Sequence, residues 1–99
     1  MLENSIEEKL KKEVKKIGGK AFKFESSGND GVPDRIVILP GGRIYFVELK
    51  RPKGGRFRKL QKWQMEQLEQ LGCNVKKIKS YEEVEKFIKE VQEVKKDEV

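Results

Sequence analysis

The sequence contains no histidine and a single cysteine, Cys73. The lack of histidine excludes zinc fingers, histidine-metal centres and every mechanism that uses an imidazole base. One cysteine cannot form an intramolecular disulfide or a cysteine-based zinc site, so we expect Cys73 to be a small buried residue. Any catalysis by this chain must therefore use carboxylates, lysine, hydroxyl groups or a hard metal ion.

Long apolar stretches are also missing. No run of the sequence approaches the ~20 apolar residues of a membrane span, and residues 1–17 carry mixed charge without the apolar core of a secretory signal. We therefore expect an intracellular, cytoplasmic protein. The chain has 99 residues, which is enough for one small domain, and we expect a single domain over residues 1–99.

Positive charge is in excess and is unevenly placed. The chain has 23 Lys and Arg against 17 Asp and Glu, a formal net charge of +6. Residues 50–62 contain seven basic side chains and no acidic one, whereas acids slightly outnumber bases in the rest of the chain. Such a local excess favours a polyanion as partner. A solvated basic loop is the alternative interpretation.

The apolar residues recur with the periods of helices and strands. Those over residues 6–17 follow a helical spacing, and Ser80 with Glu83 has the spacing of a capping box. We expect helices over residues 2–17, 57–71 and from 81 onward, and strands over residues 21–25, 35–39, 43–50 and 74–78. The order α-β-β-β-α-β-α predicts an α/β domain in which helices pack on a sheet.

The helix over residues 57–71 is expected to turn one apolar face toward the sheet. That face consists of Leu60, Trp63, Gln64, Leu68 and Leu71. On this pattern Trp63 belongs to the core, and a role as a platform for stacked bases is the alternative.

Asp34, Glu48 and Lys50 are the residues most suited to chemistry. Glu48 and Lys50 are two apart on one expected strand, so their side chains leave the same face of the sheet. Asp34 opens the neighbouring strand, and a hairpin would bring it beside Glu48. Two adjacent carboxylates repel unless a cation lies between them, and oxygen ligands suit Mg²⁺ or Mn²⁺. Lys50 could then stabilise charge on a phosphate or hold a water molecule. A surface ion pair between Glu48 and Lys50 is the alternative.

Several short motifs occur in order along the chain. They are Gly31-Val32-Pro33-Asp34-Arg35, Pro40-Gly41-Gly42, Phe46-Val47-Glu48-Leu49-Lys50, Leu60-Gln61 with Trp63, and Leu71-Gly72. Together they resemble the VRR-NUC domain, a branch of the PD-(D/E)xK nuclease superfamily, over about residues 6–88. The resemblance implies a restriction-endonuclease-like fold, with a central mixed sheet flanked by helices.

The same resemblance implies an activity. The expected protein is an endodeoxyribonuclease that depends on Mg²⁺ or Mn²⁺ and hydrolyses phosphodiester bonds in structured or branched DNA. Small members of the family lead us to expect a homodimer, with four-way (Holliday) junctions as candidate substrates, in the cytoplasm of a bacterial or phage-infected cell.

Roles for individual residues also follow from the resemblance. Asp34, Glu48 and the backbone carbonyl of Leu49 would be metal ligands, and Lys50 would complete the catalytic group. In the first helix the family's acid aligns with Glu7, which would reach the metal directly or through water. Glu13 and Glu3 are the alternatives to Glu7.

Further residues are expected to act beside this centre. Gln61 could orient water or the scissile phosphate, although an ordinary polar position at the helix boundary is equally consistent with the sequence. The residues expected to contact DNA are Lys23, Ser26, Ser27, Arg51, Lys53, Arg56, Arg58 and Lys59. A surface lysine and a polar turn are the alternatives for Lys23 and for the two serines.

Two other functional classes compete with a nuclease. A catalytically silent nucleic-acid-binding module would keep the fold and the basic segment without cutting. A small interaction domain with no nucleic-acid role would lack the steep salt dependence of phosphate contacts. Cleavage assays with plasmid and branched DNA, with and without chelator, would separate the three.

Overall fold

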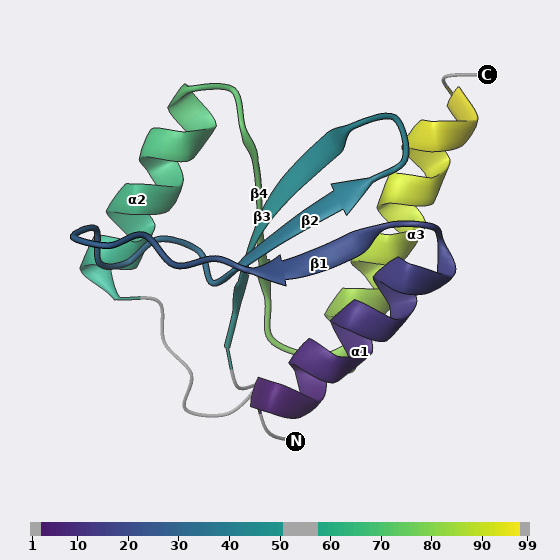
Figure 1. Ribbon diagram of the computed structural model, residues 1–99, viewed down its shortest axis with the longest axis horizontal. Coiled ribbons are helices and arrows are strands. Elements are labelled where there is room, and N and C mark those ends of the chain that lie inside the picture. The colour runs from purple at the N-terminus through teal and green to yellow at the C-terminus, as the bar shows by residue number, and fades with distance from the viewer. Residues whose placement is uncertain (1–2, 51–57, 98–99) are drawn as a thin grey trace.

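The computed structural model describes residues 3–50 and 58–97 (Figure 1). Its elements are α1 (Glu3–Lys16), β1 (Lys20–Lys23), β2 (Arg35–Leu39), β3 (Arg43–Leu49), α2 (Lys59–Gln70), β4 (Asn74–Ile78) and α3 (Tyr81–Asp97). This order confirms the predicted α/β fold class. Among the described residues, no helix is both long enough and apolar enough to cross a membrane.

The four strands form one mixed sheet in the order β1-β2-β3-β4. β1 pairs antiparallel with β2, β2 antiparallel with β3, and β3 parallel with β4. β2 and β3 form a hairpin whose turn is closed by a 3.1 Å bond from the Gly42 N–H to the Leu39 carbonyl. In this hairpin Arg35 pairs with Val47. The hairpin register therefore sets the preceding residue, Asp34, opposite Glu48.

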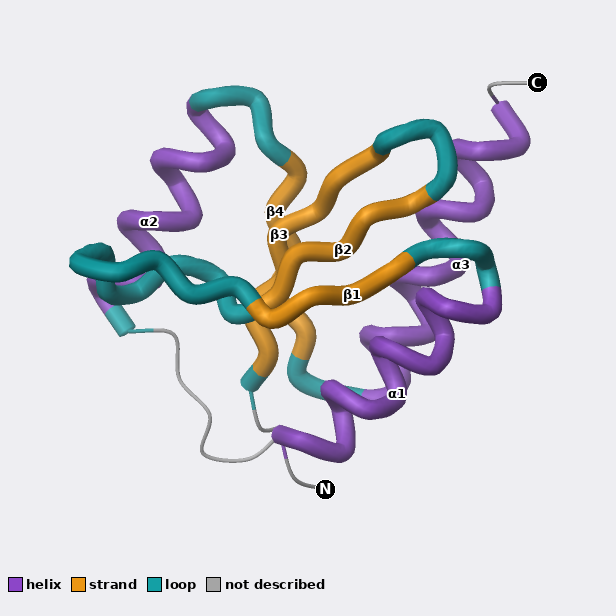
Figure 2. The backbone as a smooth tube through the Cα atoms, viewed as in Figure 1, coloured by secondary structure: helices purple, strands orange, loops and turns teal. Residues whose placement is uncertain are grey.

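The hydrophobic core lies between one face of the sheet and the helices α1 and α3 (Figure 2). The apolar stripe of α1 is buried, as the helical spacing predicts, and it packs with the inward residues of β2 and β3. Tyr45 meets Phe87 of α3 edge to face, with 5.3 Å between ring centroids. The opposite face of the sheet carries α2, which the figure shows on the other side from α1 and α3.

The N-terminus of α3 is capped, but not by the reciprocal box that the sequence predicts. The Glu83 N–H donates to Ser80 Oγ at 3.1 Å, as expected. The Glu83 carboxylate, however, accepts from the Lys79 N–H at 2.6 Å and not from the N–H of Ser80. The hydrogen bond to the Glu83 carboxylate therefore comes from the residue before the N-cap and not from the N-cap itself.

The buried face of α2 differs from the expected one. Gln61 and Met65 are its buried residues, whereas Trp63 is 53% exposed. Leu60 and Leu71 are exposed as well. The prediction that Trp63 belongs to the core is therefore wrong. Polar contacts of Gln61, described below, set the rotation of this helix.

Candidate active site

Asp34 and Glu48 face each other across the β2–β3 hairpin. The Asp34 N–H donates to Glu48 Oε1, and the Leu49 N–H donates to Asp34 Oδ1, both at 3.2 Å. Each carboxylate therefore accepts a hydrogen bond from the backbone of the other strand. This reciprocal bonding extends the hairpin by one pair and fixes both side chains at the end of the sheet.

The backbone around Asp34 is held from several sides. Its carbonyl accepts from the Phe24 N–H at 2.8 Å and from Arg35 Nη1 at 2.7 Å. Pro33 is fully buried. Gly31 has φ +85°, and a Cβ there would lie 2.9 Å from Leu60 Cγ, so glycine is required both by the backbone conformation and by the close approach of α2. The segment before Asp34 is thus packed directly against the start of α2.

Glu48 is a buried carboxyl, with only 2% of its surface exposed. Burial raises its pKa from 4.5 to about 8, helped by the side-chain hydrogen bond and the negative charge of Asp34. Lys50 opposes this shift, because its Nζ lies 3.3 Å from Glu48 Oε2. Glu48 and Lys50 are therefore in contact within a partly enclosed site, and their ion pair is not a surface pair.

Gln61 connects α2 to this pair of acids. Its Nε2 donates a short hydrogen bond to Glu48 Oε2, and its Oε1 accepts from the Arg58 N–H at 2.9 Å. These two partners fix which end of the amide points to the carboxyl, because only the nitrogen can donate to it. Gln61 is buried, so the interpretation as ordinary boundary polarity is not supported.

Glu7 lies in α1 and forms an ion pair with Arg35. Arg35 is 7% exposed and also bonds the Asp34 carbonyl, so it links the acid of α1 to the backbone at the site. Its neighbour in the hairpin, Val47, belongs to the core shared with α1 and α3, which places Arg35 on that face of the sheet. Of the two alternatives, Glu13 pairs with Lys16 and the side chain of Glu3 lies outside the described ones.

Arg35 is the residue of the site that sequence reasoning missed. It follows Asp34 directly and is part of a quoted motif, but it carries the single charge at the start of an apolar strand. A charge in that position signals either an exposed strand end or a buried partner, and the sequence does not reveal that the partner is Glu7.

The expected DNA contacts fall into four groups. Arg58 and Lys59 are exposed at the start of α2. The backbone N–H of Arg58 donates to Gln61 Oε1. Lys23 is exposed and pairs with Glu25 at 3.2 Å. Ser26 Oγ and the Ser27 carbonyl both accept from the Asn29 side chain, as in a polar turn. The remaining three, Arg51, Lys53 and Arg56, lie outside the described residues.

Comparison with known proteins identifies the family. A solved structure described as a VRR_NUC domain superposes with a TM-score of 0.83 at 32% sequence identity, over 88% of this chain and 94% of that one. The chain belongs to the VRR-NUC domain family. No family model matches the sequence. The protein "Putative nuclease p44" of Acyrthosiphon pisum secondary endosymbiont phage 1 is 62% identical over 50 residues. That match covers 50% of this chain and 54% of the phage protein.

The VRR-NUC site offers a donor set that fits a hard divalent cation. Asp34 and Glu48 face each other, and the pKa of Glu48 is raised partly by the charge of Asp34. A cation between them would remove that repulsion. Within residues 3–50 and 58–97, no group of three Asp, Glu, His or Cys side chains could hold a metal. Two carboxylates suit Mg²⁺, which keeps several of its water molecules when it binds to proteins.

Proposed function

We propose that this chain is a nuclease that hydrolyses phosphodiester bonds of DNA with the help of Mg²⁺ or Mn²⁺. The observation that carries the proposal is the contact of Asp34, Glu48 and Lys50 at the end of the hairpin. The name of the phage relative and the VRR-NUC family support the same reaction class.

Each residue of the site has a proposed role that follows from its position. Asp34, Glu48 and the backbone carbonyl of Leu49 would hold the cation, which supplies an acidified water and neutralises charge on the phosphate. Lys50 is the cationic member of the group and would stabilise the charge that develops on the phosphate oxygens. Gln61 keeps Glu48 in place through its fixed amide, so that its proposed role is to position the carboxylate.

Glu7 keeps a proposed role at the site, now through Arg35. The ion pair neutralises the guanidinium whose other nitrogen holds the Asp34 carbonyl. Glu7 would therefore act on the metal site by fixing the backbone of Asp34, or through a bridging water, rather than as a close ligand.

The proposed substrate is structured or branched DNA, including four-way junctions, in a bacterial or phage-infected cell. A phage relative supports this setting, although the matched segment is about half of that protein. We further propose that a homodimer makes paired cuts, because a four-way junction has two-fold symmetry and each chain supplies one site. Sedimentation of the free protein and of its junction complex would test the dimer.

Replacing either acid tests the proposed reaction. Asp34→Asn and Glu48→Gln should each abolish cleavage of plasmid and branched DNA in Mg²⁺ or Mn²⁺. DNA binding should persist or tighten slightly, because a negative charge that repels phosphate is removed. Glu66→Gln is the matched control, since Glu66 is an exposed acid of α2, and it should cut as the unmodified chain does. Chelator should stop cleavage in every active protein.

The outcomes separate the competing functions. A chain that binds DNA but never cuts it is the silent binding module, which the retained acids and Lys50 disfavour. A chain that does not bind DNA in a salt-dependent way is an interaction domain. Cleavage by Asp34→Asn or Glu48→Gln at the rate of the control would refute the assignment of these two acids.

A further inference from the structure

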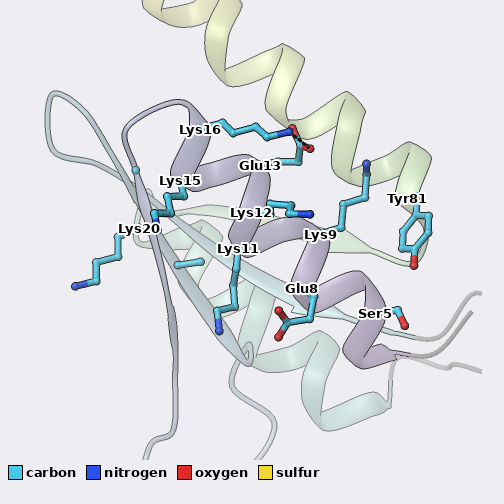
Figure 3. Close-up of a pocket in the computed structure, with 12 residues that line it drawn as sticks. Ser5, Glu8, Lys9, Lys11, Lys12, Glu13, Lys15, Lys16, Lys20 and Tyr81 are labelled. Atoms are coloured by element: carbon cyan, nitrogen blue, oxygen red, sulfur yellow. Dashed lines mark hydrogen bonds and ion pairs between the residues drawn. The ribbon is translucent and has the colours of Figure 1, made fainter.

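The outer side of α1 carries a lysine-rich groove that the proposed reaction does not use. The groove has a volume of about 850 Å³ and runs along α1 to the start of β1 and to Tyr81 of α3 (Figure 3). Its basic residues are Lys9, Lys11, Lys12, Lys15, Lys16 and Lys20. Two acids, Glu8 and Glu13, also line it, so positive charge is in clear excess there. We call this surface the α1 groove.

Much of this charge is not compensated by neighbouring side chains. Lys16 pairs with Glu13, and Lys9 pairs with Glu85 of α3. Among the described residues, Lys11, Lys12 and Lys15 take part in no ion pair. In Figure 3, Lys11, Lys15 and Lys20 lie along the side of the groove away from Tyr81. A row of uncompensated ammonium groups along a groove attracts polyanions.

Helix stability alone does not explain the lysines. Lys15 and Lys16 lie in the last turn, where a positive charge favours the helix dipole. Lys11 and Lys12 lie farther from the C-terminus, beyond the last turn in which that effect operates. Like charges four residues apart, as in Lys11 with Lys15, destabilise a helix slightly. The helix dipole therefore accounts for Lys15 and Lys16 but not for Lys11 and Lys12.

The α1 groove is connected to the candidate active site. Glu7, one turn before Lys11, pairs with Arg35, which bonds the Asp34 carbonyl. These contacts pass through the sheet, because α1 packs on the face opposite to the one on which Glu48 meets Gln61 of α2. The groove therefore faces a different side of the molecule from the acids, and a DNA segment in the groove would be a different one from the segment at the acids.

We propose that the α1 groove binds the phosphate backbone of a second DNA segment, such as another arm of the branched molecule whose first arm lies in the active site. This inference rests on the proposed function, because it takes DNA as the polyanion. Phosphate contacts of this kind position the substrate without reading its sequence. The groove would therefore favour DNA that is long or branched enough to reach both surfaces.

Salt-dependent binding by a paired variant tests the groove. Lys11→Gln with Lys15→Gln removes two positive charges, and Lys86→Gln with Lys89→Gln removes the same charge from two exposed lysines of α3 that do not line the groove. Binding to a four-way junction is measured in chelator over a series of salt concentrations. The groove variant should show a plot of log K against log salt that is flatter by roughly 0.9 for each phosphate that it no longer neutralises. The α3 control should keep the slope of the unmodified chain.

Each result supports or refutes the groove separately from the nuclease. Equal slopes for the groove variant and the α3 control would refute DNA binding by the groove. The groove proposal would also be refuted if its lysines were needed for binding to anionic phospholipid vesicles but not for binding to DNA. Circular dichroism checks that both variants fold, as their exposed positions lead us to expect. Because the measurement needs neither metal nor cleavage, a chain that cuts no DNA can still show the slope change. A chain that cuts DNA with an unchanged slope refutes only the groove.

Discussion

Glu48 combines burial, a second acid and a lysine at one carboxyl. Its Oε1 accepts from the Asp34 backbone, and its Oε2 lies between Gln61 and Lys50. In the absence of a cation, burial and Asp34 raise its pKa to about 8 against the opposing effect of Lys50. Deprotonation of Glu48 is thus a cost that a bound divalent cation would offset.

This raised pKa predicts how stability changes with pH. The folded chain binds one more proton than the unfolded chain between the ordinary pKa of 4.5 and the raised pKa of about 8. Stability from Glu48 is therefore complete below about pH 4.5 and is lost as pH rises toward 8. Denaturant titrations of the metal-free protein at several pH values measure this loss, and Glu48→Gln should flatten it.

Addition of Mg²⁺ provides the complementary test. A cation binds the deprotonated carboxylate, so it should stabilise the folded chain most at high pH and least in Glu48→Gln. A pH profile that is the same for the unmodified chain and Glu48→Gln, with and without Mg²⁺, would contradict the assignment of the proton to this carboxyl.

Lys50 is expected to act in the transition state rather than as a simple phosphate contact. Strand alternation and the 3.3 Å contact with Glu48 aim its ammonium group into the site. Lys50→Ala should reduce the single-turnover cleavage rate by ~10²–10⁴-fold, the usual contribution of a general acid–base group or an electrostatic stabiliser. Saturating amounts of enzyme should not restore the rate, because the defect is not one of binding.

Lys62→Ala serves as the control, since Lys62 is an exposed lysine of α2 and the last basic residue of the segment 50–62. It should weaken binding at most, and excess enzyme should recover its rate. If the Lys50→Ala rate at saturation is within about threefold of the unmodified rate, far below those factors, Lys50 is only a phosphate contact.

At the scale of elements, the sheet was the most predictable part of the fold. β2 and β4 begin and end at the predicted residues. In β2 an apolar, largely β-branched run between turn residues is a strong local signal. The hairpin partnership of Asp34 and Glu48 follows from the short turn after Leu39. Its exact register did not follow, since a shift by one residue is decided by packing on both faces.

The rotation of α2 could not be predicted from its apolar pattern. An apolar stripe placed Leu60, Trp63 and Leu71 inward, yet the structure turns Gln61 and Met65 toward the sheet. Glu48 is a buried carboxyl on that face, and it needs a donor. Gln61 supplies the donor, and this requirement outweighs the burial of apolar side chains on a short helix.

This rotation predicts unequal effects of two substitutions in α2. Met65 is 1% exposed, so Met65→Ala should reduce the free energy of unfolding by about 2–5 kcal/mol. Trp63→Ala should change it by less than about 1 kcal/mol, because half of the Trp63 surface is already in water. Urea denaturation of both variants measures the difference. A larger loss from Trp63→Ala than from Met65→Ala would restore the face expected from the sequence.

The site also depends on partners that come from distant parts of the chain. Glu7 and Arg35 are 28 residues apart in the numbering, and neither has a local pattern that pairs it with the other. The family resemblance points to an acid in the first helix, whereas the structure shows that this acid meets an arginine. Long-range ion pairs of this kind form only after the helix and the sheet have packed together.

At the scale of the whole molecule, folding redistributes the positive charge. The linear sequence concentrates its excess in residues 50–62, where acids are absent. In the fold, α1 adds a second basic surface, because its buried stripe turns the intervening lysines outward. A count along the chain misses this surface, since four acids nearly balance the lysines of α1 in sequence, whereas in the fold Glu7 pairs with Arg35 instead.

The two basic surfaces should differ in the DNA that they require. Arg58 and Lys59 are exposed at the start of α2, where Gln61 joins the helix to Glu48. A double variant, Arg58→Gln with Lys59→Gln, should therefore weaken binding to linear and branched DNA alike, because under the proposed function any DNA at Glu48 would pass this position. The slope of log K against log salt should flatten by roughly 0.9 for each phosphate left without its cationic partner. Lys86→Gln with Lys89→Gln is again the matched control.

A short linear duplex, too short to reach the α1 groove, should respond to the α2 variant and not to the groove variant. An unchanged slope on that duplex for Arg58→Gln with Lys59→Gln would place the start of α2 away from the DNA.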